Sequence, residues 1–93
     1  EAKRREAEAR NRRNRELRIH KERIAALEKK ILPQETRLKE IDAALGSPET
    51  YQEAGRAQAL GEEKKALEIE LAHLYDEWDE ATRELERDEE KRA

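Results

Sequence analysis

The chain has 93 residues, of which 48% are charged and 34% hydrophobic, with one Trp, two Tyr and no Cys, Met or Phe. So little apolar material excludes a layered core, and this composition is typical of coiled coils and long helices. The absence of Cys excludes a disulfide, a thiolate nucleophile and a Cys-based zinc site. No run approaches the roughly 18 consecutive apolar residues of a membrane span, so we expect a cytoplasmic protein with no membrane partner.

Residues 1–16 open the chain with a basic, strongly charged segment. Their composition favours a helix but supplies no apolar stripe, so we expect a basic helical extension or linker. Residues 1–23 hold ten Lys or Arg against five Glu, whereas residues 76–90 hold nine Asp or Glu against two Arg. If the chain folds back, either these two segments neutralise each other along solvated faces, or the basic arm overhangs the pair and binds phosphate.

The first long amphipathic helix is predicted over residues 17–45, where apolar residues recur at heptad spacing. They are Leu17, Ile24, Leu27, Ile31, Leu38, Ile41 and Leu45. Pro33 lies inside this array, where it removes one intrahelical hydrogen bond and its ring clashes with the preceding turn. Because Pro33 falls on the side away from the apolar stripe, we expect helix one to be kinked near Pro33 rather than broken.

Residues 46–56 interrupt the heptads and are predicted to reverse the chain. Gly46 suits the position just after a helix, which often needs a positive φ angle. Ser47 followed by Pro48 indicates an N-cap with Pro at the first helical position. A short helical turn is therefore expected to run through Tyr51.

The second helix is predicted over residues 57–91, and its apolar stripe is nearly as long as the first. The stripe consists of Ala57, Leu60, Leu67, Leu71, Leu74, Trp78 and Leu85. Because neither helix can bury its stripe alone, the sequence predicts an all-α fold, a two-helix antiparallel coiled-coil hairpin over residues 17–91. Two chains that paired through the same seam would make similar contacts, so self-association stays open.

The two stripes also predict a register for the antiparallel pairing. The reversal is expected to centre near Tyr51. This register places His20 opposite Ala81 and Ile24 opposite Trp78.

Polar residues on or near the seam are interpreted as structural. Gln34 and Lys64 are expected to fix register and partner number at some cost in stability. His20 is expected to be a packed, partly exposed seam residue, and His73 a surface residue. The two histidines fall at opposite ends of the pairing, so they are not expected to share a metal ion.

No motif in the chain indicates catalysis. The sequence contains neither a Gly-x-x-x-x-Gly-Lys-Ser/Thr loop nor a Gly-x-Gly-x-x-Gly loop that would cradle a nucleotide. Carboxylate pairs such as Asp76-Glu77 and Asp79-Glu80 are expected on solvated faces, where no apolar cavity raises a pKa for general acid work. We therefore expect no enzyme activity and no catalytic, cofactor-binding or metal-binding residue.

Nucleic-acid binding is the function that the charge pattern favours. A dense, mainly arginine cluster near the N-terminus is suited to phosphate contacts. The candidate nucleic-acid-binding residues are Lys3, Arg4, Arg5, Arg10, Arg12, Arg13, Arg15, Arg18 and Lys21. No aromatic residue lies among them to stack on bases, so binding would be led by the phosphate backbone and largely independent of sequence.

Three elements over residues 17–86 resemble a known family. The first is the basic heptad segment Arg-Ile-Ala-Ala-Leu-Glu at 23–28. The second is the break Leu-Gly-Ser-Pro-Glu-Thr-Tyr at 45–51, and the third is Leu-Tyr-Asp-Glu-Trp at 74–78. The Pro-x-x-Tyr break followed by Tyr-x-x-Trp at this distance resembles the C-terminal coiled-coil domain of ABC-F ATPases of the Uup type.

The resemblance implies an accessory domain that follows two ATP-binding cassettes. ATP and magnesium would belong to those upstream cassettes, and this fragment would hold no cofactor. The implied role is translation control or nucleic-acid handling, with the hairpin contributing to binding DNA, ribosomal RNA or the ribosome. The chain departs from the family pattern in two respects: Pro33 interrupts helix one, and the far end of the hairpin, residues 36–65, is not basic. We therefore expect any nucleic acid on the basic side of helix one.

The alternative is a structural or protein-interaction coiled coil with no nucleic-acid role, for which self-association is open. Heptad periodicity by itself favours this alternative, and the Pro-x-x-Tyr and Tyr-x-x-Trp elements favour the first hypothesis. The two differ in salt dependence, because phosphate binding weakens steeply as salt is raised.

Overall fold

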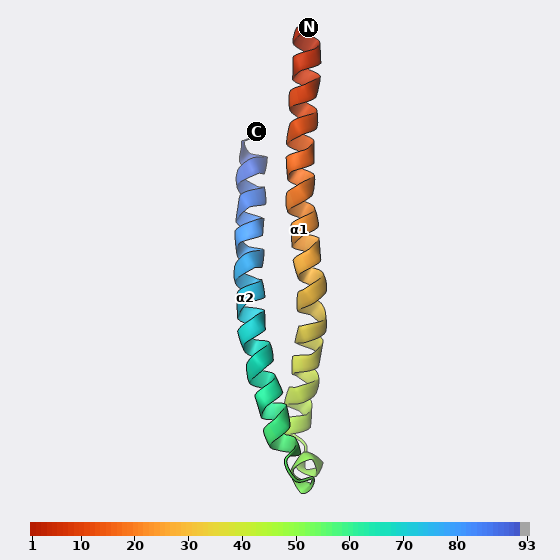
Figure 1. Ribbon diagram of the computed structural model, residues 1–93, viewed down its shortest axis with the longest axis vertical. Helices are drawn as coiled ribbons and strands as arrows, with labels where there is room; N and C mark the ends of the chain where they lie inside the picture. Colours follow the sequence, from red (N-terminus) through yellow and green to blue (C-terminus); the bar gives the residue numbers. More distant parts are fainter. Residues whose placement is uncertain (92–93) are drawn as a thin grey trace.

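The computed structural model describes residues 1–91 and shows two long helices joined by a short reversal. Helix α1 runs from Ala2 to Leu45, the 3₁₀ helix η1 from Pro48 to Gln52, and helix α2 from Arg56 to Glu90. The two long helices lie side by side and antiparallel in a rod of 76 × 16 × 15 Å (Figure 1). The predicted all-α antiparallel hairpin is confirmed, and no strand occurs within residues 1–91.

The core is a narrow seam between α1 and α2 that follows the heptad positions. Every position of the two predicted stripes is buried or half-buried. The buried apolar side chains are Leu17, Leu27, Ile31, Ile41, Leu71, Leu74 and Ala81. Burial of such a side chain contributes about 1.5–3 kcal/mol for the larger residues, so the seam, rather than helix propensity, holds the long helices together.

Helix α1 continues without interruption through Pro33, so the chain is not divided at this residue. The pyrrolidine ring is exposed, and the heptad positions on either side of it remain in the seam. Packing along the seam therefore offsets the hydrogen bond that Pro33 removes. A local kink at Pro33 stays a prediction. The main change of chain direction begins at Pro48, because Ser47 is extended (φ −94°, ψ 128°), as steric contact with a following proline favours.

The positive φ angle of the reversal falls on Gly55 rather than on Gly46, so the prediction for Gly46 is wrong. Gly46 stays right-handed (φ −84°, ψ −7°), and its N–H bonds to the carbonyls of Asp42 and Ala43 continue the helical pattern. Gly55 has φ 79° and precedes the first residue of α2. The left-handed residue is thus needed where the chain enters α2, because Ser47 already turns it out of α1.

Two side chains of η1 cap the C-terminal end of α1. The hydroxyl of Thr50 donates a hydrogen bond of 2.5 Å to the carbonyl of Ala44, and the hydroxyl of Tyr51 donates one of 2.7 Å to the carbonyl of Leu45. Thr50 is only 2% exposed, whereas Tyr51 is 61% exposed. The last carbonyls of a helix lack intrahelical partners, so these two hydroxyls tie the reversal to the helix that it follows.

The predicted register is wrong by about one helical turn. His20, expected opposite Ala81, instead lies against the next two turns of α2. Its Nε2 is 2.7 Å from a carboxylate oxygen of Asp88, and its Nδ1 is 3.7 Å from one of Glu84.

The opposite helix shows the same displacement. Trp78 was expected opposite Ile24, but its indole N–H donates to Glu28, one turn further along α1, at 3.1 Å. Heptad stripes repeat every three to four residues, so a slip of about one turn still sets apolar residues opposite one another. The length and shape of the reversal select between these registers, and the stripes do not.

The two polar residues of the seam differ in how they are satisfied. The Nζ atom of Lys64 lies 2.7 Å from a carboxylate oxygen of Asp42, and this contact raises the pKa of Lys64. The side-chain oxygen of Gln34 is buried and has no hydrogen-bond partner within residues 1–91. Lys64 therefore reaches the edge of the seam, whereas Gln34 carries a cost in stability.

Candidate nucleic-acid interface

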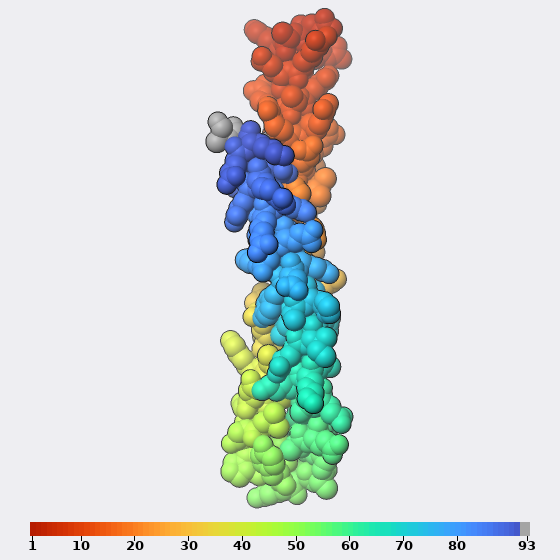
Figure 2. All heavy atoms as spheres, turned by 90° about the vertical axis from the view of Figure 1, so that its left-hand side faces the viewer, coloured from red at the N-terminus to blue at the C-terminus, as the bar shows by residue number. Residues whose placement is uncertain are grey.

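The open end of the hairpin is asymmetric because α1 is longer than α2. Helix α1 has 44 residues and α2 has 35. A cavity of about 120 Å³ at the end of the pair is lined by Arg13, Glu16 and Leu17 together with Asp88 and Lys91. The part of α1 before this level extends alone beyond the end of α2 (Figures 1 and 2). We call residues 1–12 the basic overhang.

The structure divides the nine predicted nucleic-acid-binding residues between two stretches of the same helix. Those in the basic overhang are Lys3, Arg4, Arg5, Arg10 and Arg12. Those on the part of α1 that α2 accompanies are Arg13, Arg15, Arg18 and Lys21. All nine side chains are exposed, so none of them is committed to the seam.

Only three of these nine residues form ion pairs within residues 1–91, and each pair joins neighbours on the same helix. The contacts are Arg4 with Glu8 at 3.6 Å, Arg5 with Glu1 at 4.0 Å and Arg18 with Glu22 at 3.9 Å. Exposed pairs of this kind contribute about 0–1 kcal/mol each. The six residues without an ion pair in the described chain are Lys3, Arg10, Arg12, Arg13, Arg15 and Lys21.

Neutralisation of α1 by the acidic part of α2 begins further along the hairpin. Arg23 lies 3.3 Å from Glu84 and 3.9 Å from Glu80, and His20 contacts Glu84 and Asp88. Of the two arrangements that the charge pattern left open, mutual neutralisation therefore applies to this level of the rod. The basic side chains nearer the N-terminus lie beyond these cross-helix ion pairs.

One face of α1 near the overhang carries a shallow, open polar depression. It has a volume of about 800 Å³ and is lined by Glu8, Asn11, Arg12, Asn14, Arg15 and Arg18. These residues follow the three- and four-residue spacing of one helix face, and none of them is a seam position. An approaching polyanion would meet three arginines there without displacing α2.

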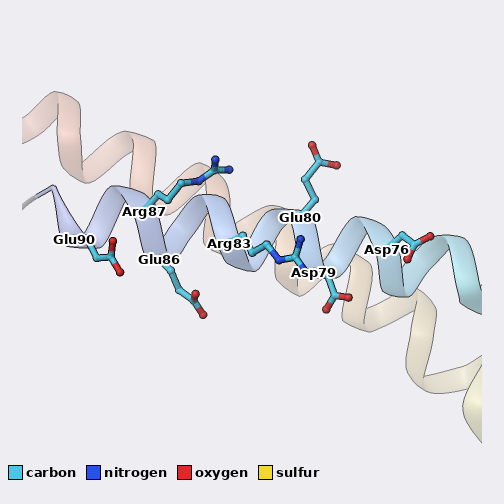
Figure 3. A pocket seen from close by; sticks show the side chains of 7 residues that line it. All are labelled: Asp76, Asp79, Glu80, Arg83, Glu86, Arg87 and Glu90. Atoms are coloured by element: carbon cyan, nitrogen blue, oxygen red, sulfur yellow. The ribbon is translucent and has the colours of Figure 1, made fainter.

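The C-terminal part of α2, residues 76–90, is acidic. An open depression of about 590 Å³ is lined by Asp76, Asp79, Glu80, Arg83, Glu86, Arg87 and Glu90. Figure 3 shows these side chains fanning out from the helix rather than converging on one point. Five carboxylates against two guanidinium groups repel phosphate, so this side of the rod does not suit nucleic acid.

The tip of the hairpin is close to neutral. Residues 36–65 hold five Lys or Arg against six Asp or Glu. Arg37 donates a hydrogen bond of 3.0 Å from Nη2 to Glu63, and this bond holds the pKa of the Glu63 carboxyl below its usual value. The tip therefore offers no excess of positive charge.

Within residues 1–91, no cluster of three or more His, Asp or Glu side chains is placed to hold a metal ion. Neither long helix contains a stretch in that range that is apolar and long enough to cross a membrane.

Sequence reasoning missed the roles of two aromatic residues on α2. Tyr75 donates its hydroxyl to Glu35 at 2.7 Å, and Trp78 donates its N–H to Glu28 at 3.1 Å. Both bonds cross from α2 to α1 at the surface. The spacing of three residues between the rings indicates one helix face, but their acceptors depend on the register, which the stripes did not fix.

A helical hairpin with this reversal and these aromatic residues matches a family model. The model is described as the ABC transporter C-terminal domain, and it matches residues 13–82. The match covers most of the chain, which therefore belongs to this family. Comparisons with curated proteins and with solved structures found no match. The matched range begins at Arg13, so the basic overhang lies outside it.

Proposed function

We propose that the chain is a non-catalytic accessory domain of an ABC-F ATPase of the Uup type and that it contributes to binding nucleic acid. Membership of the ABC transporter C-terminal domain family supports the accessory role. The Pro-x-x-Tyr and Tyr-x-x-Trp elements support the subfamily. In this proposal ATP and magnesium act in cassettes upstream of this chain, and the nucleic acid is DNA or ribosomal RNA, free or in the ribosome.

The observation that supports nucleic-acid binding is the exposed positive charge at the open end. Arg10, Arg12, Arg13 and Arg15 lie within less than two turns, and none has an ion pair within residues 1–91. Planar guanidinium groups bind phosphate oxygens in a bidentate manner. Contacts of this type position a protein on the phosphate backbone and carry little sequence information.

Fluorescence anisotropy with a labelled duplex DNA and a labelled structured RNA tests the proposal. If about four phosphates are contacted, affinity should fall roughly a hundredfold between 50 and 200 mM salt, because bound counterions are released. Failure of the chain to bind either nucleic acid at about 50 mM salt would contradict a direct role of this domain.

A charge-matched pair of variants locates the site. Replacing Arg10, Arg12, Arg13 and Arg15 by Gln should abolish binding and leave melting nearly unchanged. The control replaces four exposed lysines elsewhere, Lys29, Lys30, Lys39 and Lys65, by Gln. It changes the net charge equally and should retain most of the affinity. Equal loss in both variants would mean that net charge, and not the open end, governs binding.

The second candidate function is a structural or protein-interaction hairpin without a nucleic-acid role. The acidic side of α2 favours it, because that surface repels phosphate. Under this alternative, both variants bind nucleic acid as weakly as the unmodified chain does.

A further inference from the structure

A small apolar groove opens on the surface where α1 and α2 meet near the middle of the rod. It has a volume of about 310 Å³ and is lined by Glu28, Ile31, Leu32, Glu35, Tyr75 and Trp78. Leu32 is 62% exposed, Tyr75 is 41% exposed and Trp78 is half-buried. In a chain of which 48% is charged, apolar side chains from both helices that gather at one surface point indicate an interaction site.

Two carboxylates border the groove and hold its aromatic rings. Glu28 accepts the hydrogen bond from the indole N–H of Trp78, and Glu35 accepts the one from the hydroxyl of Tyr75. The bond to Glu35 raises the pKa of Tyr75, so the phenol remains a donor at neutral pH. Each carboxylate therefore accepts one bond from a ring of α2.

The spacing of the carboxylates defines the geometry of a ligand. Glu28 and Glu35 are seven residues apart on α1, which places them two turns or about 10.5 Å apart along the helix axis. Leu32 lies between them on the same helix. The groove therefore presents an apolar centre with negative charge toward either end.

This chemistry selects among ligands. The carboxylates repel phosphate, and a purely apolar ligand would strip water from two charges without pairing them. A cationic side chain pairs with a carboxylate and also stacks favourably on an aromatic face. An aliphatic side chain between two such cations would cover Leu32 and the rings.

We propose that the groove docks an amphipathic helix of a partner protein that carries Lys or Arg seven residues apart with Leu or Ile between them. Helix-in-groove docking uses this spacing of apolar anchors, and the charge complementarity sets its orientation. The site is separate from the basic overhang, and the proposal does not depend on nucleic-acid binding.

Trp78 is the single tryptophan of the chain, so its fluorescence reports on the groove directly. The probe is an acetylated, amidated helical peptide of about fourteen residues with Arg at two positions seven apart and Leu at the two positions midway. We expect a saturable change in Trp78 emission. A second peptide with Glu in place of the two Arg should bind at least about tenfold more weakly. Equal binding of the two peptides, or no saturable change, would overturn the proposal.

Variants of the groove separate charge from shape. Glu28→Gln together with Glu35→Gln keeps both acceptor oxygens but removes both charges, and it should weaken binding of the Arg peptide about tenfold. Leu32→Ser should weaken it comparably. The matched control is Ile69→Ser, which alters a side chain that is 64% exposed on α2 outside the groove. This control should bind as the unmodified chain does, and equal weakening in it would refute the site.

Sedimentation without peptide distinguishes a second copy of the chain from a partner protein. If the chain self-associates at all as its concentration is raised, the proposal expects Leu32→Ser to leave that association unchanged. Association of that kind would assign the groove to self-pairing and overturn the partner assignment.

Discussion

The two ends of the hairpin differ in how their backbone and charge are held. At the closed tip, Thr50 and Tyr51 donate hydroxyl hydrogen bonds to the last carbonyls of α1. At the open end, α1 extends past α2 (Figure 1). The side chains of that end have few partners, and the ion pairs of Arg4 and Arg5 join neighbours on the same helix. The same helix is therefore tied down at one terminus and free on every side at the other.

Charge follows the same division. At the tip, Arg37 pairs with Glu63 and Lys64 with Asp42, so opposite charges meet across the helices. At the open end, basic side chains lie where α2 has already ended. The comparison teaches that helix length, not local composition alone, decides whether a charged segment is neutralised. An extension of α1 by a few turns converts a solvated face into a surface available to a polyanion.

The largest expected effect comes from truncating the seam near the tip. Ile41 is completely buried, so Ile41→Ala should lower the free energy of unfolding by about 3–4 kcal/mol, the sum of lost burial and an unfilled cavity. Leu17→Ala at the open end should cost about 2 kcal/mol, because the terminal layer can relax. Urea unfolding followed by circular dichroism measures both. If Leu17→Ala lowered the free energy of unfolding more than Ile41→Ala, the tip would not be the more firmly held end of the hairpin.

The caps at the tip should have smaller and unequal effects. Thr50→Val keeps the shape but removes the buried hydroxyl bond. The carbonyl of Ala44 still accepts the N–H of Ser47 at 3.1 Å, so the cost should be that of one hydrogen bond, about 1 kcal/mol. Tyr51→Phe removes a donor that is exposed, so water replaces it and the cost should be about 0.5 kcal/mol. Thermal melting compares the two variants. If Tyr51→Phe were the more destabilising, the exposed hydroxyl of Tyr51, and not the buried hydroxyl of Thr50, would be the main bond that secures the reversal.

The smallest expected effect is the pH dependence of the ion pair at the tip. Because Arg37 lowers the pKa of folded Glu63, the pair stabilises the hairpin above the ordinary carboxyl pKa. That contribution is lost as pH falls through the lowered pKa. A side-chain carbon NMR titration should show that Arg37→Gln raises the pKa of Glu63. Arg56→Gln, the control, should leave it unchanged. The same Glu63 pKa in all three proteins would show that the pair is not formed in solution.

Heptad spacing was sufficient to predict the secondary structure and the seam. Leu27, Ile31, Leu71 and Leu74 fall on the predicted stripes and are buried, because burial of an amphipathic face dominates over local propensity in helices this long. Even Pro33 was correctly placed off the seam, where it is exposed.

The details of the reversal were less predictable. Gly46 was expected to supply the positive φ angle, yet Gly55 does so, because Ser47 before Pro48 already provides the exit from α1. The capping role of Thr50 had no signal in the pattern. It depends on how η1 folds back onto the last turn of α1, and that contact exists only in the folded hairpin.

The candidate surfaces were predicted in part. The basic residues near the N-terminus are visible in the sequence, but their position beyond the end of α2 follows from the register. At the groove, the sequence showed only that Tyr75 and Trp78 are three residues apart. Its acceptors, Glu28 and Glu35, come from the other helix.

The sequence by itself determined that two amphipathic helices pair through their apolar stripes, because neither helix can bury its stripe alone. Only the tertiary structure decided the register, since stripes that repeat every three to four residues fit one another after a slip of about one turn. That register sets how far α1 extends past α2 and which carboxylates meet the aromatic rings. The positions of both proposed binding surfaces are therefore consequences of the reversal.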